Sequence, residues 1–424
     1  MHLGDASPSH PPIVVDTVRG EKGPADGLCS LFMAITALEN QADYGGCVHA
    51  AGATSISIPA GTFDISGGLV LGPPAGATPS VTFTLVGRGV GSTSLDTDGV
   101  ASPAIELDGL TVKLSQLTVR ATNPANPTTG LRLDGSAVVT LDHTRVTGFT
   151  HSGVWNADAT LTLLASTIDG NSTSGLGGGL YAAAQDANAS PTTFIHYSTI
   201  SGNSAFSGGG IYNLGYLNLM YSTIAGNMAT GGKGGGIYLA QDYLETGHCT
   251  IAWNSATETG LGGGIYIDPS VQANVHVNSS IVAHNTGSAL APDYSGMLRD
   301  RLTRIYDRDV LGSAAGVTAG KGRVDVVGDP WLDVLRDNGG PTETCALLES
   351  SPAIDASRDF SARSTTDQSL ACAPYGPAYD VGAYEWRPRP TSLSRQGFNV
   401  LATLLCVVVG LAIAVVGIGK YRSR

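Results

Sequence analysis

The feature that most constrains the fold is an internal repeat in the middle of the chain. The phrase STIDGNSTSGLGGGLY begins at Ser166, related phrases begin at Ser198, Ser222 and Cys249, and a fainter copy, SSIVAHN, begins at Ser279. The period varies from 24 to 32 residues, as measured between Ile168, Ile200, Ile224, Ile251 and Ile281. Ankyrin-type repeats have a fixed length, and propeller blades need about 40 residues. A coil of short strands joined by turns of variable length fits, and this is a parallel β-helix.

The residue types within each repeat predict which side chains face inward. Side chains alternate along a strand, so the serine and isoleucine of Ser-Thr-Ile share one face and the threonine takes the other. We expect buried rows of the isoleucines and of Ser166, Ser198, Ser222 and Cys249. We expect an outward, hydroxyl-rich row of Thr167, Thr199, Thr223, Thr250 and Ser280. Stacked asparagines can hydrogen-bond along the coil axis, and the candidates are Asn171, Asn203, Asn227, Asn254 and Asn285.

Segments before the repeat extend the coil. ISIPAGTFDI, LTVKLSQLTV and LRLDGSAVVTLDHTRV alternate like short strands and predict less regular rungs. Apolar residues at helical spacing in residues 27–40 predict an amphipathic helix, within residues 13–50, that caps the open end. We therefore expect an all-β parallel β-helix of about ten rungs over residues 13–328.

A second constraint comes from the C-terminus. Residues 398–419 contain 22 residues without a charge, a length that crosses a bilayer as a helix; the alternative is a buried core helix. The basic residues 420–424 after the span favour a cytoplasmic tail, which places the β-helix on the other side of the membrane. We expect residues 387–397 to be a linker. Residues 1–12 are expected to be disordered and lack the apolar core of a signal peptide, so we expect a truncated or misassigned start, or a removed leader.

Charge and cysteine content exclude several partners. The net charge is −12, which disfavours binding to nucleic acid. Two local cysteine pairs, Cys29 with Cys47 and Cys345 with Cys372, are compatible with disulfides, and four free buried thiols are the alternative. The sequence contains no CxxC or Cys/His cluster, so we predict no metal site, and we predict no cofactor.

Three segments resemble known families. ADGLCSLFMAITALEN resembles the CSLREA-type N-terminal segment of bacterial surface proteins, with Phe32 and Met33 where Arg and Glu are usual. The GNSAFSGGGIY repeats resemble those of chlamydial polymorphic outer membrane proteins and of right-handed β-helix proteins generally. Residues 335–356, with YDVGAYE at 379–385, resemble the choice-of-anchor Q domain, although its Asp-Gln-Arg-Gly stretch is reduced to Asp367 and Gln368.

These resemblances imply a right-handed β-helix in a bacterial envelope protein displayed outward, and they imply no reaction. We expect the segment at 329–386 to close the C-terminal end of the coil. PRPTSLSRQG is faintly similar to an IPTL-type sorting tail, and no LPxTG motif is present.

Two rows of side chains are candidate sites. Three positions before the repeated isoleucines stand Tyr197, Tyr221, His248 and Asn278, of which Tyr197, Tyr221 and His248 are candidate catalytic acid and base residues. The simpler interpretation is outward aromatic stacking that stabilises the coil. After the glycine triplets stand candidate ligand-binding residues Tyr181, Tyr212, Tyr238 and Tyr266, a platform for sugars or peptides or, more simply, stacked side chains.

We predict a membrane-anchored bacterial surface protein, adhesin-like or structural, whose repeat surface binds a glycan or a host or neighbour surface. The alternative is a polysaccharide lyase or glycoside hydrolase on the same scaffold, because a fold alone does not decide function.

Overall fold

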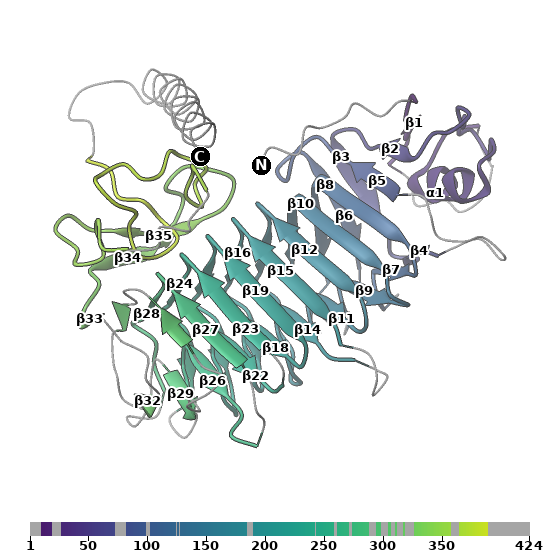
Figure 1. The fold of residues 1–424 in the computed structure, drawn as a ribbon. Helices are drawn as coiled ribbons and strands as arrows, with labels where there is room; N and C mark the ends of the chain where they lie inside the picture. The colour runs from purple at the N-terminus through teal and green to yellow at the C-terminus, as the bar shows by residue number, and fades with distance from the viewer. Residues whose placement is uncertain are drawn as a thin grey trace, which may run out of the picture.

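The computed structural model describes a long solenoid (Figure 1). The described residues are 10–18, 27–72, 82–98, 102–123, 125–126, 128–184, 190–241, 243–257, 261–270, 274–287, 294–297, 304–306, 310–311, 317–318, 326–357 and 364–388. Residues 1–9, the predicted linker beyond residue 388 and the predicted span at 398–419 lie outside them.

Parallel strands of successive turns form the faces of the coil. One sheet has ten strands: β4 (Leu69–Leu71), β7 (Ile105–Asp108), β9 (Leu131–Asp134), β11 (Val154–Asn156), β14 (Leu180–Ala182), β18 (Ile211–Asn213), β22 (Ile237–Leu239), β26 (Ile265–Ile267), β29 (Tyr294–Met297) and β32 (Val317–Thr318). A small third sheet contains β17 (Ser204–Ala205), β21 (Met228–Ala229) and β25 (Ser255–Ala256).

A 20-stranded sheet forms the other two flanks, and β8 (Thr111–Ala121) and β10 (Val138–Thr147) run through both. The first flank, the front flank, holds β1 (Ile13–Val14), β2 (Ser55–Ser57), β5 (Thr82–Val86), β12 (Thr160–Leu164), β15 (Thr192–His196), β19 (Tyr216–Met220), β23 (Tyr243–Gly247), β27 (Asn274–Asn278) and β30 (Arg304–Tyr306). The second, the threonine flank, holds β3 (Gly61–Asp64), β6 (Thr93–Thr97), β13 (Thr167–Asp169), β16 (Thr199–Ser201), β20 (Thr223–Ala225), β24 (Thr250–Ala252), β28 (Ile281–Ala283), β31 (Val310–Leu311) and β33 (Val326–Val327).

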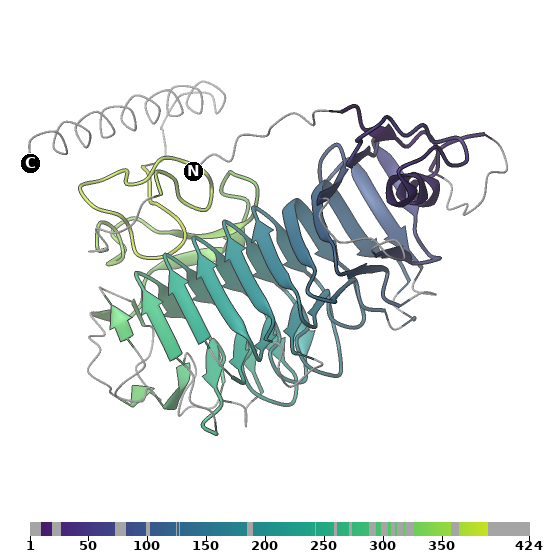
Figure 2. The same ribbon diagram turned by 45° about the vertical axis from the view of Figure 1, so that its right-hand side comes forward.

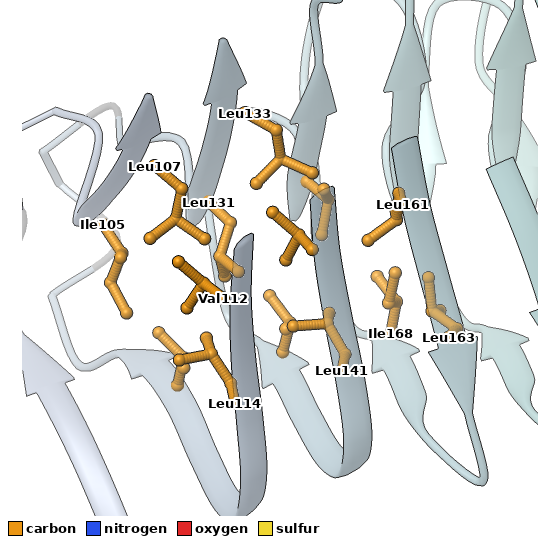
Figure 3. Packing of buried hydrophobic residues seen from close by; sticks show 14 of the residues in the cluster. Ile105, Leu107, Val112, Leu114, Leu131, Leu133, Leu141, Leu161, Leu163 and Ile168 are labelled. Atoms are coloured by element: carbon orange, nitrogen blue, oxygen red, sulfur yellow. The ribbon is translucent and has the colours of Figure 1, made fainter. Parts of the chain in front are cut away.

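The predicted parallel β-helix is confirmed, with about seven regular turns against the ten or so expected. Leucine, isoleucine and valine side chains from all faces meet inside the coil (Figure 3). The repeated isoleucines stack in register from Ile168 to Ile251 and are fully buried.

The fifth repeat is aligned one residue away from the prediction. Val282, and not Ile281, pairs with Ile251, while Ile281 pairs with Thr250. Ser280 is fully buried, and its Oγ accepts a hydrogen bond from Cys249 N, so it continues the inward serine row and not the outward threonine row. The physical reason is the asparagine three residues after Val282, which fixes the alignment of this turn.

The asparagine ladder is confirmed by hydrogen bonds from turn to turn. The Nδ2 of each asparagine donates to the Oδ1 of the next at 2.9–3.0 Å, from Asn171 to Asn285. The same Oδ1 atoms also accept from the backbone N of the preceding asparagine. Buried amides must find such partners, so the ladder fixes the register of five turns.

The glycine triplets serve both the turn and the close approach of neighbouring turns. Gly208 has a φ of +65°, which other residues rarely adopt. The next residue, Gly209, has no room for a side chain, because a Cβ would lie 2.6 Å from Gly235 O.

The predicted N-terminal helix is α1 (Leu31–Asn40), and it begins at the N-cap Ser30, whose Oγ accepts from Met33 N at 3.3 Å. Its apolar side chains, among them Leu31, Ala34 and Leu38, join the same buried cluster as the first strands. The disulfide between Cys29 and Cys47, predicted from the sequence, ties the start of α1 to the following loop.

The sequence predicts that the C-terminal segment closes the end of the coil. In the structure the segment instead lies along the threonine flank (Figure 1, Figure 2). Its antiparallel hairpin consists of β34 (Leu332–Arg336) and β35 (Thr344–Leu347). The hairpin packs on outward apolar residues of the coil, including Ala225, Ala252 and Ile281. These small apolar side chains leave a flat surface that needs a cover, which explains the position of the segment. We call the described residues between 329 and 386 (329–357 and 364–386) the docked segment.

Three of the four outward threonines are hydrogen-bonded to the docked segment. Thr199 Oγ1 donates to Glu343 O at 2.6 Å, and Thr223 Oγ1 donates to Gln368 Oε1 at 2.6 Å. Thr250 Oγ1 accepts from Ala383 N at 3.0 Å. All three threonines are buried. The flank expected to be a free hydroxyl-rich surface is therefore an internal interface.

The predicted pair of Cys345 and Cys372 does not form. Cys345 is a free, buried thiol among the apolar residues between the hairpin and the coil. Burial raises its pKa to about 12, so it stays protonated at neutral pH. Cys345 is enclosed in this apolar cluster, which contains no second cysteine among the described residues.

Three carboxyl groups are buried inside the docked segment. Asp367, Asp380 and Glu385 are each 3% exposed. Arg387 pairs with Asp367, and backbone N–H groups donate to Glu385 and Asp380. Burial raises the pKa of Asp380 to about 6 and, together with the charge of Asp380, the pKa of Glu385 to about 8. At least one of these carboxyls therefore holds a proton at neutral pH.

Substituting one rung of the asparagine ladder is expected to destabilise the coil. Asn227→Ala leaves the backbone N–H and one Nδ2–H of Asn203 without their acceptor and removes the donor to Ile200 O. At about 1–3 kcal/mol for each buried unpaired group, we expect a loss of about 3–5 kcal/mol in urea unfolding. The exposed Asn123→Ala is the control and should change stability by less than about 0.5 kcal/mol. Equal effects of the two variants would contradict the role of the ladder.

Docking of the C-terminal segment is expected to weaken as the pH rises. Folded pKa values above the unfolded ones make the docked state most stable at low pH, and this stability is lost as pH rises through about 6 and about 8. The amides of Val381 and Gly382, which donate to Ala353 and Ser279, should lose protection from hydrogen exchange across this range, whereas Ile237 in the coil should not. Glu385→Gln should flatten the response. Protection that is independent of pH would show that these carboxyls do not control docking.

Candidate functional site

The predicted catalytic row forms a stack on the threonine flank. The rings of Tyr197 and Tyr221 lie 5.3 Å apart and nearly parallel, and Tyr221 and His248 lie 5.2 Å apart. Each of the three residues has a positive φ, near 50°, at a corner of the coil. Ser279, and not Asn278, takes the corresponding corner in the next turn, in agreement with the shifted fifth repeat.

The docked segment covers this stack. Tyr197 OH bonds to Ser364 Oγ at 2.9 Å, His248 Nδ1 lies 3.2 Å from Asp380 O, and the Tyr379 ring packs edge-on against His248. Tyr221 is 8% exposed and His248 is 3% exposed. A stack so enclosed supports the interpretation of these residues as packing side chains that hold the docked segment.

The second predicted row is a ladder on the ten-stranded sheet, in which Tyr181, Tyr212 and Tyr238 are part-exposed and Tyr266 is buried. Tyr181, Tyr212, Tyr238 and Tyr266 occupy one register position in β14, β18, β22 and β26, and Trp155 of β11 extends the row by one turn. Neighbouring ring centroids lie 4.7–5.8 Å apart. We call these five residues the aromatic ladder.

The two ends of the aromatic ladder differ. At the Tyr266 end, Tyr238 OH donates to Asp268 at 2.7 Å, and Lys233 donates to Tyr266 OH at 2.8 Å. At the other end, the hydroxyls of Tyr181 and Tyr212 have no hydrogen-bond partner within the described residues. Burial raises the pKa of both hydroxyls, so they stay protonated donors.

The Tyr181 end also leaves more ring surface free. Tyr212 and Tyr238 are stacked at 4.7 Å and 20°, so their facing surfaces cover each other. Trp155 and Tyr181 are 5.8 Å apart and tilted by 50°, and Tyr181 and Tyr212 are tilted by 47°. The guanidinium of Arg132 lies 4.7 Å from the Trp155 ring centroid. Its charge is paired with Asp134, and Glu106 is its register partner on β7, so no unpaired cation lies at this end of the ladder.

A third group of polar side chains, on the front flank, is not evident from the sequence alone. His196 Nε2 lies 3.1 Å from Asn218 Oδ1, and Asn218 Nδ2 donates to Glu245 Oε2 at 3.0 Å. Tyr243 OH also donates to Glu245 Oε2, at 3.4 Å, and His276 is the register partner of Glu245 on β27. Burial lowers the pKa of His196, which favours the neutral ring. We call these five residues the front cluster.

The sequence does contain a signal for the front cluster. Asn218 and Glu245 stand six residues before Ile224 and Ile251, and His276 stands six residues before Val282. The variable residue types at this position hide the pattern, because only the alignment of the turns shows that they are neighbours.

Two further properties concern the described residues alone. No group of three or more His, Cys, Asp or Glu side chains in the described ranges is arranged to hold a metal ion. Within the same ranges, no helix is long and apolar enough to cross a membrane.

Comparison with known proteins agrees with the coil. Residues 108–298 match a family model described as a right-handed β-helix region. No curated protein and no solved structure matches the chain. The matched residues contain the repeats, the aromatic ladder and the front cluster. The match and the observed solenoid together show that this is a β-helix protein.

Proposed function

We propose that the chain is a bacterial surface protein that binds neutral glycans through the Trp155–Tyr212 end of its aromatic ladder. The observation that carries the proposal is the combination, at one end of the ladder, of tilted, part-exposed rings with two hydroxyl donors that have no partner among the described residues. Binding sites for small ligands typically combine apolar or aromatic walls with a few polar groups that fix orientation. Tyrosine supplies both from one rigid side chain.

The charges around the ladder favour a neutral ligand. Arg132 pairs with Asp134 at 2.6 Å, and Lys233 lies at the far end near Asp268. Neither cation is left to attract an acidic polymer. A glycan without uronate or sulfate groups therefore fits the site better than a charged one.

The cellular location is also part of the proposal. The uncharged stretch at 398–419 with its basic tail supports a membrane anchor, and the resemblance to CSLREA-type and choice-of-anchor Q segments supports display outside the cytoplasm. We further propose that α1 caps the N-terminal end of the coil, because its buried face joins the core of the first turns.

Removing the two hydroxyls should weaken glycan binding. The double variant Tyr181→Phe/Tyr212→Phe keeps both rings and removes only the donors, so we expect affinity for a bound neutral polysaccharide to fall about tenfold in calorimetric titration. Tyr216→Phe, on the front flank, is the matched control. Unchanged affinity of the double variant would contradict the ladder site, and no binding by the wild-type protein would favour a purely structural role.

A second candidate function, a polysaccharide lyase, is favoured by the front cluster alone. Glu245 Oε2 accepts from both Asn218 and Tyr243, and Tyr216 and His276 neighbour the same carboxylate. A carboxylate beside a neutral histidine and a tyrosine supplies groups for general acid–base catalysis. Hydrolysis by a carboxylate pair is less well supported, because Glu245 is the cluster's single carboxylate.

The lyase alternative predicts product release from a polysaccharide panel, seen as new reducing ends or as absorbance from unsaturated uronates. If it holds, Glu245→Gln should lower the rate at least about 100-fold, because it removes the base. The exposed Glu349→Gln should leave the rate unchanged. If the wild-type protein releases no product from any polysaccharide of the panel, lyase activity is excluded for those substrates.

A further inference from the structure

The chain leaves the docked segment only a short distance before the proposed membrane anchor. Trp386 is packed against the apolar cluster between the docked segment and the coil. Residues 387–397 separate it from the uncharged stretch at 398–419. At about 3.6 Å per extended residue, this linker reaches at most about 40 Å. If the chain is anchored at 398–419, the docked segment therefore lies close to the bilayer surface.

A loop of the docked segment lies beside the point where the chain leaves it. We call residues 370–378, with the sequence LACAPYGPA, the exit loop. Arg387, the first residue of the linker, donates to Cys372 O at 2.7 Å. Tyr375 N donates to Glu385 Oε1 at 2.8 Å. These two bonds hold the exit loop against the start of the linker.

The exit loop presents an uncharged, apolar surface. Residues 368–379 contain no charged side chain. Leu370 is 46% exposed and Tyr375 is 51% exposed. The three other exposed residues of the loop are two prolines and a glycine. Aromatic side chains with one apolar and one polar end, such as tyrosine, are enriched where proteins meet lipid headgroups.

The backbone of the exit loop is bound by charged side chains of the docked segment and the linker. Besides the bonds made by Glu385 and Arg387, Asp355 Oδ1 accepts from Ala378 N at 3.2 Å. A backbone polar group without a partner is costly in contact with lipid. These three bonds lower that cost and leave the apolar side chains of the loop at the surface.

We propose that the exit loop rests in the headgroup region of the bilayer that anchors the chain, with Leu370 and Tyr375 in contact with lipid. Because the loop carries no charge, the contact does not require anionic lipid. It turns the docked segment toward the membrane and the ten-stranded sheet with its aromatic ladder away from it; in Figure 1 the docked segment lies above the coil and β22, β26 and β29 lie below it. This inference rests on the anchor in the proposed function and adds the orientation of the coil.

The test places the photo-reactive amino acid p-benzoylphenylalanine at Tyr375 of the full-length protein, in nanodiscs of phosphatidylcholine. After irradiation, intact-mass spectrometry measures the fraction of protein that carries an attached lipid. The same amino acid at Phe206 is the matched control, because Phe206 is also aromatic and is 50% exposed, next to β17 of the coil. We expect at least about tenfold more lipid adduct at position 375 than at position 206.

A variant of the exit loop tests whether its apolar side chains make the contact. Leu370→Asn suits the φ of +60° at this position, so the melting temperature should not fall. The adduct at position 375 should fall at least about threefold, because a polar side chain replaces an apolar one. An unchanged yield would overturn the proposed contact.

The remaining outcomes separate this inference from the proposed function. Equal adduct at positions 375 and 206 would overturn the lipid contact. Protein that is held in the discs without adduct at position 375 would overturn the contact and leave the membrane anchor standing. Protein that does not enter the discs would overturn both the anchor and the contact. Glycan binding is read separately, from the Tyr181→Phe/Tyr212→Phe variant.

Discussion

The structure depends on the hydrogen-bonded asparagine ladder inside the coil. Each amide bridges two turns and also satisfies a backbone N–H, so a slip of one residue would leave several buried polar groups unpaired. The ladder therefore holds turns of unequal length in one register. Turn length can vary from 24 to 32 residues because the paired strands of each face keep nearly the same length, so the difference falls between the strands.

A fixed register has a direct consequence for the surface. Equivalent positions of successive turns become continuous rows, and each row is either covered or open. The threonine row and the Tyr197–His248 stack are covered by the docked segment. The aromatic ladder and the front cluster belong to other faces. Position relative to the docked segment, more than residue type, therefore decides which rows can meet a ligand.

Much of the fold follows from residue pattern. The isoleucine, serine and asparagine rows, the helix at the N-terminal end and the Cys29–Cys47 disulfide are all predictable from the sequence. The one-residue shift of the fifth repeat is harder to predict, because Ile281 has the same residue type as the repeated isoleucines. Only the number of residues between Val282 and Asn285 indicates that Val282 is the residue that pairs with Ile251.

The sites are harder to predict than the fold. Nothing local in the sequence shows that residues 329–386 fold back on the threonine flank, because that contact joins positions more than 100 residues apart. The front cluster likewise depends on which turns are neighbours. On a solenoid, the side chains of one site therefore come from successive turns and not from neighbouring positions in the sequence.

Hydrogen exchange of the free protein and of the protein with a bound neutral polysaccharide tests the central claim most directly. The account predicts that β16, β20 and β24 are protected in both states, and that added protection appears around β11, β14 and β18. Rapid exchange on the threonine flank of the free protein, with new protection confined to that flank, would contradict it.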